Sequence, residues 1–359
     1  MVPVISISFG NCKGADYKQA VKGIADSFYN MYEAHRYLLK STRLEAEDLK
    51  EYKSLRELFR AGDTGRIEIA IQRLCRLVYL HYQILPVILG DEYDTPLLEA
   101  YTDGYWSEMI GTCRQLFHST FKENPYYARA LITGVTKVSK NSLFSDLNNL
   151  ETDTVTCEAY SDCFGFTEQE VMDALKCQNM DTMHDVKEMY DGFIFGKQKD
   201  IYNPWSIINF LDKKEYNTYW ADSSSNGLIN NLVKKGSPCI KMMMETLLKE
   251  ETIDVLINEQ IVFSELDYSE DAVWSLMLAS GYLKVVAAEP LVGNRRKARK
   301  YTLALTNLEI RFMFEDMILR WFSPAKMETN EFIRALINGD IESMNAYMNK
   351  VTLKTISYF

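Results

Sequence analysis

Three short apolar runs separated by longer helical patterns constrain the fold of this 359-residue chain more than any other feature. The runs are Val2–Phe9, Ile84–Leu89 and Ala128–Gly134. Between them, apolar residues recur at helical spacing, most clearly over residues 17–39 and 67–78. Strands that alternate with helices in this way form parallel sheets. We therefore predict an α/β fold, with the first and third runs as buried strands and the first buried on both faces.

The second half of the chain changes character. Thr167-Glu168-Gln169-Glu170 fits a capping box at the start of a helix, and Pro204 suits the first turn of another helix. From Ser225 to about Phe263 the pattern is mostly helical. A helix, two strands and a return helix then suggest a winged-helix module, over the segments Asp271–Ser280, Tyr282–Ala288, Lys300–Leu305 and Asn307–Phe322.

Composition excludes several classes of protein. The chain has 40 basic and 50 acidic residues, a net charge of −10, so any contact with nucleic acid must use a local basic patch. Seven scattered cysteines without a C-x-x-C pair indicate reduced thiols in a cytoplasmic protein, mostly buried. The four histidines do not fall at zinc-ligand spacing. No apolar run approaches the ~18 to 20 residues that a membrane-spanning helix needs.

The loop after the second apolar run is the strongest functional signal. Gly90-Asp91-Glu92-Tyr93-Asp94-Thr95-Pro96 places two adjacent carboxylates at the end of a strand. In a nucleotide hydrolase, one such acid can hold the magnesium ion and the next can orient or deprotonate the attacking water. Thr133 ends the next predicted strand, at the same edge of the sheet, where ligands of α/β proteins bind. It is a candidate to hydrogen-bond the water or the γ-phosphate.

These residues also have ordinary interpretations. The acidic loop can simply close a strand, with Asp94 capping the next turn, and the Thr133 hydroxyl can satisfy backbone at a strand end. Lys137, Lys140 and Arg129 are nearby candidates for phosphate contacts, although basic residues at strand ends are usually only solvated. No G-x-x-x-x-G-K-[ST] loop occurs, and Gly192–Gln198, the closest string, has the wrong spacing.

A basic cluster offers a different function. Five positive charges fall within six residues at the predicted hairpin tip: Arg295, Arg296, Lys297, Arg299 and Lys300. A hairpin of this kind can lie along a nucleic-acid groove and contact its phosphates. The ordinary alternative is that such charges protect strand edges from association.

Five segments in order resemble one family, the bacterial and archaeal AAA-ATPase-like proteins, and the resemblance extends over nearly the whole chain. They are Gly90–Pro96, Thr133–Leu150, Phe164–Val171, Tyr190–Gly196 and Ile201–Ile207. The first resembles the Walker B region and the second resembles the sensor strand with its following loop. The resemblance implies a P-loop NTPase core that binds ATP and Mg²⁺, with Asp91 and Lys137 as nucleotide-binding residues and Glu92 and Thr133 as catalytic residues.

The sequence departs from the family pattern at both ends. Family members begin with a strand, a phosphate-binding loop and a helix, and often carry a PD-(D/E)XK nuclease-like domain at the C-terminus. We expect a fragment that lacks both, with the missing strand lying between the strands of the acids and the sensor. Its absence would leave unpaired strand edges in the core. The expected parts are a truncated core (1–160), a helical lid (161–225), a winged-helix-like domain (226–323) and a linker (324–359).

Two functions follow from these observations. The first is Mg²⁺-dependent ATP hydrolysis, coupled to movement of the C-terminal region and possible in this chain only with the missing parts supplied. A homo-oligomer is a further possibility that the resemblance leaves open. The second is a non-catalytic module that binds DNA or protein through the hairpin Arg295–Lys300.

Overall fold

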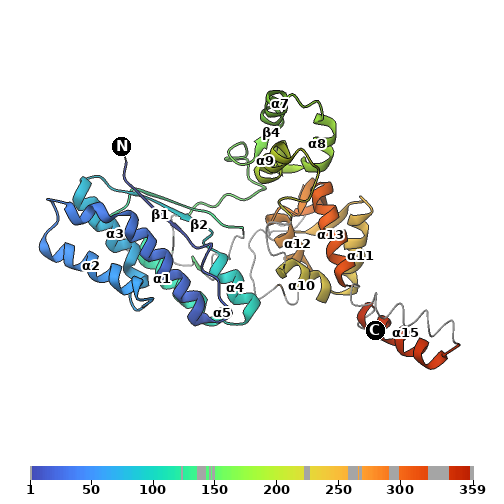
Figure 1. Cartoon of the computed structure of the whole chain (residues 1–359), viewed down its shortest axis with the longest axis horizontal. Helices are drawn as coiled ribbons and strands as arrows, with labels where there is room; N and C mark the ends of the chain where they lie inside the picture. Colours follow the sequence, from blue (N-terminus) through green and yellow to red (C-terminus); the bar gives the residue numbers. More distant parts are fainter. Residues whose placement is uncertain are drawn as a thin grey trace.

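The computed structural model of the chain describes most of its residues (Figure 1). The described ranges are 2–122, 124–135, 143–144, 147, 150–221, 227–257, 266, 269–290, 299–321 and 339–355. Lys137, Lys140 and the run Arg295–Lys297 lie outside these ranges, so their predicted roles are not addressed by the structure.

The N-terminal part is built on a parallel sheet of three strands, as the sequence predicts. The strands are β1 (Val4–Ser8), β2 (Val87–Asp91) and β3 (Arg129–Ile132), in the order β1-β2-β3. Val4 pairs with Val87, which pairs in turn with Arg129. The carboxyl ends of all three strands therefore lie at one edge of the sheet.

Helices cover one face of this sheet and lie together on one side of it in Figure 1. Those in contact with one another include α1 and α2, α3 and α5, and α4 and α5. Apolar residues at helical spacing, such as Ile24, Phe28 and Tyr32 in α1, form the buried side of this layer. The bounds are α1 (Tyr17–Ala34), a 3₁₀ helix (Arg36–Lys40), α2 (Ala46–Arg60), α3 (Ile67–Tyr82), α4 (Thr95–Asp103) and α5 (Trp106–Phe121).

The prediction that β1 is buried on both faces is wrong. Ile5 and Ile7 are buried, whereas Val4, Ser6 and Ser8 are exposed. The prediction that β3 is buried is also wrong, because Leu131 is 58% exposed. Apolar content cannot reveal whether a second layer is present, and among the described residues only one face of the sheet is covered by helices.

The expected position of the missing strand is also wrong. β2 pairs directly with β3, and Leu89 stands opposite Leu131, so no strand fits between the acids and Thr133. Within the part of the chain that the structure describes, the unpaired edges lie instead on the outer sides of β1 and β3. Sequence gives the order of strands along the chain but not their order in the sheet, which caused this error.

Residues 166–213 form a small α+β module with its own core, in which Tyr190, Tyr202 and Phe210 are buried. Its strands form the antiparallel sheet β4-β6-β5. The predicted capping box of α7 is present, and Asn203 caps α9 through its side chain. The bounds are β4 (Phe166–Thr167), α7 (Glu168–Cys177), α8 (Met183–Tyr190), β5 (Phe193–Phe195), β6 (Gln198–Tyr202) and α9 (Pro204–Lys213).

The C-terminal part contains the predicted helix, hairpin and return helix, together with an additional strand. That strand, β7, falls inside the stretch expected to be mostly helical and pairs with β9, giving the antiparallel sheet β7-β9-β8. The winged-helix interpretation stays a prediction. The bounds are α10 (Gly227–Lys235), α11 (Pro238–Leu248), β7 (Ile253–Leu256), α12 (Glu270–Ala279), β8 (Leu283–Pro290), β9 (Arg299–Leu305), α13 (Leu308–Trp321) and α15 (Ile341–Thr355).

A buried carboxylate joins the 166–213 module to the C-terminal part. Glu309 on α13 is 0% exposed and accepts hydrogen bonds from Ser206 Oγ (2.8 Å) and from the backbone N–H of Trp220 (2.7 Å). Burial raises the pKa of Glu309, and these hydrogen bonds partly oppose the shift. Aromatic contacts extend this junction, because the Phe193 ring packs on Trp220, Trp220 on Tyr282, and Tyr282 on Phe314.

Burial varies within three groups of side chains. Phe193 packs on Trp220, whereas Trp205 is 55% exposed. Met244 is buried, but Met242 is exposed. The cysteines are not mostly buried, since three are buried and three exposed: Cys12, Cys75 and Cys113, against Cys163, Cys177 and Cys239.

Candidate active site

Asp91 and Thr133 meet at the carboxyl edge of the N-terminal sheet. Asp91 is the last residue of β2, and Thr133 follows β3 directly. Thr133 Oγ1 donates a hydrogen bond of 2.6 Å to Asp91 Oδ1, and the Thr133 backbone N–H donates to the Gly90 carbonyl at 2.8 Å. Asp91 is exposed, so its carboxylate stays accessible to a ligand while the pairing of β2 with β3 fixes its place.

The Glu92 side chain turns toward β1, on the other side of β2 from β3 and Thr133. Its backbone has a φ of +52°, and its side-chain Oε2 accepts a hydrogen bond of 3.2 Å from Thr95 Oγ1. A Cβ added at Gly10, just after β1, would lie 2.5 Å from Oε2, which places the Glu92 carboxylate against the Gly10 backbone. Burial raises the pKa of the Cys12 thiol to about 11, and the negative charge of Glu92 is a smaller contribution.

Asp94 is the buried acid of the loop, only 1% exposed. It occupies the N-cap position of α4 but makes no side-chain cap hydrogen bond there. Its Oδ1 accepts from the Val135 backbone N–H at 3.3 Å instead. A side chain at Gly134 would collide with the same carboxylate, so Gly134 provides the room for this contact. Asp94 therefore ties the acidic loop to the segment after β3.

The three acids thus point in different directions from one loop. Two of them, Asp91 and Glu92, are exposed at the carboxyl edge of the sheet, where α/β proteins bind ligands. A carboxylate oxygen with a neighbouring hydroxyl suits Mg²⁺, which prefers oxygen ligands. Within the described residues no three His, Cys, Asp or Glu side chains are grouped closely enough to hold a metal ion.

The remaining candidate residues do not gather here. Arg129 begins β3, so it lies at the opposite end of that strand from Thr133. Arg299 belongs to β9, and the Lys300 ammonium pairs with Asp254 Oδ2 at 2.7 Å, which raises the pKa of Lys300. The proximity of Arg129 to the acids was therefore wrongly predicted, and Lys300 is engaged within its own sheet.

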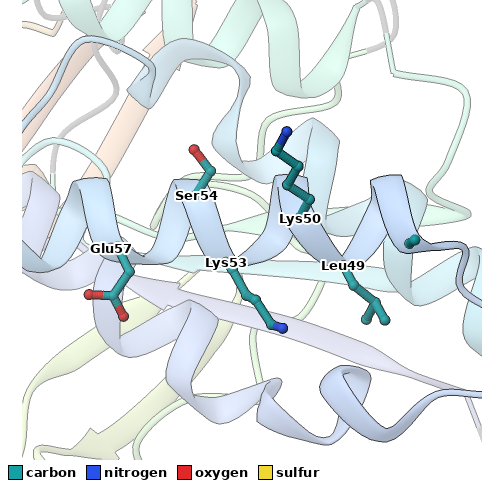
Figure 2. A pocket seen from close by; sticks show the side chains of 6 residues that line it. Leu49, Lys50, Lys53, Ser54 and Glu57 are labelled. Atoms are coloured by element: carbon teal, nitrogen blue, oxygen red, sulfur yellow. The ribbon is translucent and has the colours of Figure 1, made fainter.

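Neither of two cavities found among the described residues lies beside Asp91. The larger, about 550 Å³, is a shallow surface along α2, and its lining residues, among them Lys50, Lys53 and Glu57, all come from that helix (Figure 2). The smaller, about 290 Å³, lies in the C-terminal part and is lined by Trp274, Glu270 and other residues.

The residues that orient the acids are hard to recognise from the sequence. Gly10, Thr95 and Gly134 contact Glu92 and Asp94, but none of them belongs to a pattern that marks such a contact. Thr95 lies within the acidic loop, which is the one local hint. Gly10 lies 82 positions before Glu92 (92 − 10), so only the pairing of β1 with β2 brings the two together.

Residues 1–144 match the family model described as a predicted AAA-ATPase. This segment belongs to the AAA-ATPase-like family. The matched range contains all three strands of the sheet and the acids at its edge. The AAA-ATPase-like segment therefore includes the whole candidate site described above.

One curated relative is 28% identical over 244 residues, an uncharacterized protein in the vnfD 5' region of Azotobacter chroococcum mcd 1. The match covers 66% of this chain and 43% of the relative, so the chain corresponds to less than half of that protein. No solved structure matches the chain. None of the helices in the described ranges is both long and apolar enough to cross a lipid bilayer.

Proposed function

We propose that the AAA-ATPase-like segment supplies the acidic half of a Mg²⁺-dependent ATP-hydrolysing site. Asp91 is assigned to the magnesium ion, Glu92 to the attacking water and Thr133 to sensing the γ-phosphate. The observation that carries this proposal is the 2.6 Å hydrogen bond between Thr133 and Asp91 at the carboxyl edge of the sheet, with Glu92 exposed beside them. The family of residues 1–144 supports nucleotide as the ligand.

Each residue has a chemical task that its position supports. The magnesium ion, when bound, would neutralise phosphate charge, which is a large part of catalysis in phosphoryl transfer. Glu92 carries a carboxylate that can accept a proton from water or orient it. The Thr133 hydroxyl donates to Asp91 and so fixes the direction of the Asp91 carboxylate. With nucleotide bound, the Thr133 hydroxyl can donate to a phosphate oxygen or to the attacking water in place of Asp91.

The phosphate-binding part of the site is assigned to a segment that adds to the free edge of β3. That edge is unpaired among the described residues, and Leu131 on β3 is 58% exposed. A parallel strand added there would bring its carboxyl end beside Thr133, since all strands of the sheet run the same way. The G-x-x-x-x-G-K-[ST] loop absent from this sequence would then face Asp91.

The remaining parts are proposed to respond to the nucleotide. We assign residues 161–225 to a lid and 226–323 to a winged-helix-like domain, both as predicted from the sequence. The junction at Glu309 supports movement of the two as one body, because Ser206 and Trp220 are held by the same buried carboxylate. An action on nucleic acid through an attached nuclease-like domain is the proposed outcome of that movement.

Nucleotide binding with and without Mg²⁺ tests the proposal. We expect Mg²⁺-dependent binding of ATP, measured by calorimetry with the phosphate-binding segment of the family supplied in cis, to be lost in Asp91→Ala. Glu92→Gln should keep binding but lower the hydrolysis rate by at least 100-fold, as expected for loss of a general base. Glu47→Gln, an exposed acid on α2, is the matched control and should change neither quantity. ATP binding that survives Asp91→Ala unchanged would refute the assignment of Asp91.

A further inference from the structure

We propose that Gly10 and Thr95 are positioning residues that hold the Glu92 carboxylate on the β1 side of Asp91. This inference rests on the proposed function, because it concerns how the water-activating acid of that site is oriented. Neither residue touches the reacting atoms. Gly10 comes just after β1, and Thr95 is the first residue of α4.

Thr95 provides the attachment. The Thr95 backbone N–H donates to the Glu92 carbonyl at 3.1 Å, and its hydroxyl donates to Glu92 Oε2 at 3.2 Å. The backbone of Thr95 is fixed by the start of α4, where Pro96 occupies the first turn. The hydroxyl therefore has a defined place, and the flexible Glu92 side chain is held to it.

Gly10 provides the space. The nearest heavy atoms to a Cβ at this position would be the carboxyl atoms of Glu92, at 2.5, 2.9 and 3.1 Å. Gly10 does not have the positive φ that favours glycine, so a larger residue is not excluded by backbone conformation. The reason for glycine at this position is thus the carboxylate of Glu92 that lies against it.

The consequence is a separation of the two exposed acids. Asp91 is directed to Thr133 on the β3 side, and Glu92 is directed to Gly10 on the β1 side. Two carboxylates that converge on one divalent cation would bind it together and leave neither free for water. Held apart, Asp91 can serve the cation while Glu92 remains a base. Releasing Glu92 from Thr95 should allow it to join Asp91.

Mn²⁺ is the probe for this separation, because its free concentration is read directly by electron paramagnetic resonance without nucleotide or turnover. The variants are Thr95→Val, Thr95→Ser and Gly10→Ala, each alone and combined with Glu92→Gln. Gly10→Ala displaces only the mobile end of a side chain, so it should fold. Gly111→Ala is the matched control, since a Cβ there meets no atom within 4 Å.

In the parent protein we expect Mn²⁺ binding to depend on Asp91 and to change little in Glu92→Gln. In Thr95→Val and Gly10→Ala, binding should tighten several-fold, and adding Glu92→Gln should remove the gain. Thr95→Ser and Gly111→Ala should behave like the parent. Equal affinity in all variants, a gain that survives Glu92→Gln, or no Mn²⁺ binding in any variant would overturn the inference.

A separate measurement distinguishes this inference from the proposed function. If Mn²⁺ affinity couples Thr95 to Glu92 but the protein completed with its phosphate-binding segment binds no ATP, the positioning inference stands and the proposed function fails. If ATP is bound and hydrolysed but Mn²⁺ affinity shows no coupling between Thr95 and Glu92, the proposed function stands and the positioning inference fails. In the hydrolysing protein, Thr95→Val should lower kcat while KM stays nearly constant, and Thr95→Ser should restore kcat.

Discussion

At the scale of single residues, two carboxyl groups withdrawn from water lead to predictions about stability. Glu309 and Asp191 are two acids away from the candidate site whose pKa values are raised by burial. Burial of an ionised carboxylate is unfavourable unless donors compensate for lost water. Glu309 has such donors, whereas Asp191 Oδ1 has no hydrogen-bond partner in the structure. The two acids therefore lead to different predictions.

Glu309→Ala should lower the free energy of unfolding by about 2–3 kcal/mol, because it leaves the Ser206 hydroxyl and the Trp220 N–H buried without an acceptor. Glu309→Gln keeps one acceptor oxygen and should cost clearly less. Urea unfolding followed by tryptophan fluorescence measures both. Equal stability of Glu309→Ala and the parent would show that the junction does not depend on this carboxylate.

Asp191 should make stability fall as pH rises. Burial, followed by the neighbouring Asp200 carboxyl, raises the pKa of Asp191 from 3.8 to about 6, so the folded state binds a proton that the unfolded state has already lost. This contribution is fully present below about pH 4 and is lost as pH rises through about 6. Lys187, 4.0 Å away, opposes the shift and holds the pKa of Asp200 low.

Asp191→Asn tests this pH dependence. The variant should gain stability over the parent at pH 7.5 and little at pH 4, because asparagine carries no proton to lose. Tm measured by calorimetry in steps between pH 4 and 7.5 provides the comparison. Parallel curves for the variant and the parent would contradict the prediction.

At the scale of elements, local signals set the helix ends. The capping box of α7 is complete: the Thr167 hydroxyl accepts from the Glu170 backbone N–H at 3.4 Å, and the Glu170 carboxylate accepts from the Thr167 N–H at 2.8 Å. Strand predictions were less accurate, as β7 shows, because a short strand acquires its pairing partner from a distant part of the chain.

Thr167→Ala should lower the free energy of unfolding by about 1 kcal/mol, the usual effect of removing an N-cap side chain. Thr167→Ser keeps the hydroxyl and serves as the control. Urea unfolding measures the difference. The prediction would be refuted if the serine variant lost as much stability as the alanine variant.

At the scale of the whole molecule, the parallel sheet has an uncovered face and two free edges, on β1 and β3, within the described residues. Parallel sheets are normally covered on both faces, and free edges with exposed apolar side chains promote association. Val4, Leu89 and Leu131 form the exposed apolar part of this face, 46%, 37% and 58% exposed respectively. We therefore expect this surface to promote self-association of the chain in solution.

Leu131→Lys should reduce self-association, because an ammonium group on the free strand opposes edge pairing. Sedimentation velocity over a range of concentrations measures the change. Leu319→Lys is the matched control, since Leu319 is 65% exposed but lies on α13, away from the sheet. If both lysine variants, or neither, altered association, the sheet would not be the surface responsible.

The accuracy of the sequence-based predictions follows from how local each signal is. Alternating strand and helix patterns located the three strands, and the acidic loop placed Asp91 where Thr133 would meet it. The same patterns misplaced Arg129, because a residue near a predicted site can lie at the other end of its strand. They also put the missing strand inside the sheet, because strand order depends on contacts that no local pattern encodes.

The sequence by itself determined the α/β class, the helix caps and the two adjacent acids at the end of β2, because these depend on neighbours within a few residues. The tertiary structure decided which face of the sheet is covered, how Glu92 is directed and why Glu309 is buried. Glu309 meets Ser206 across 103 positions, and Gly10 meets Glu92 through strand pairing. Such contacts form only when distant segments pack, so their physical cause lies in the fold.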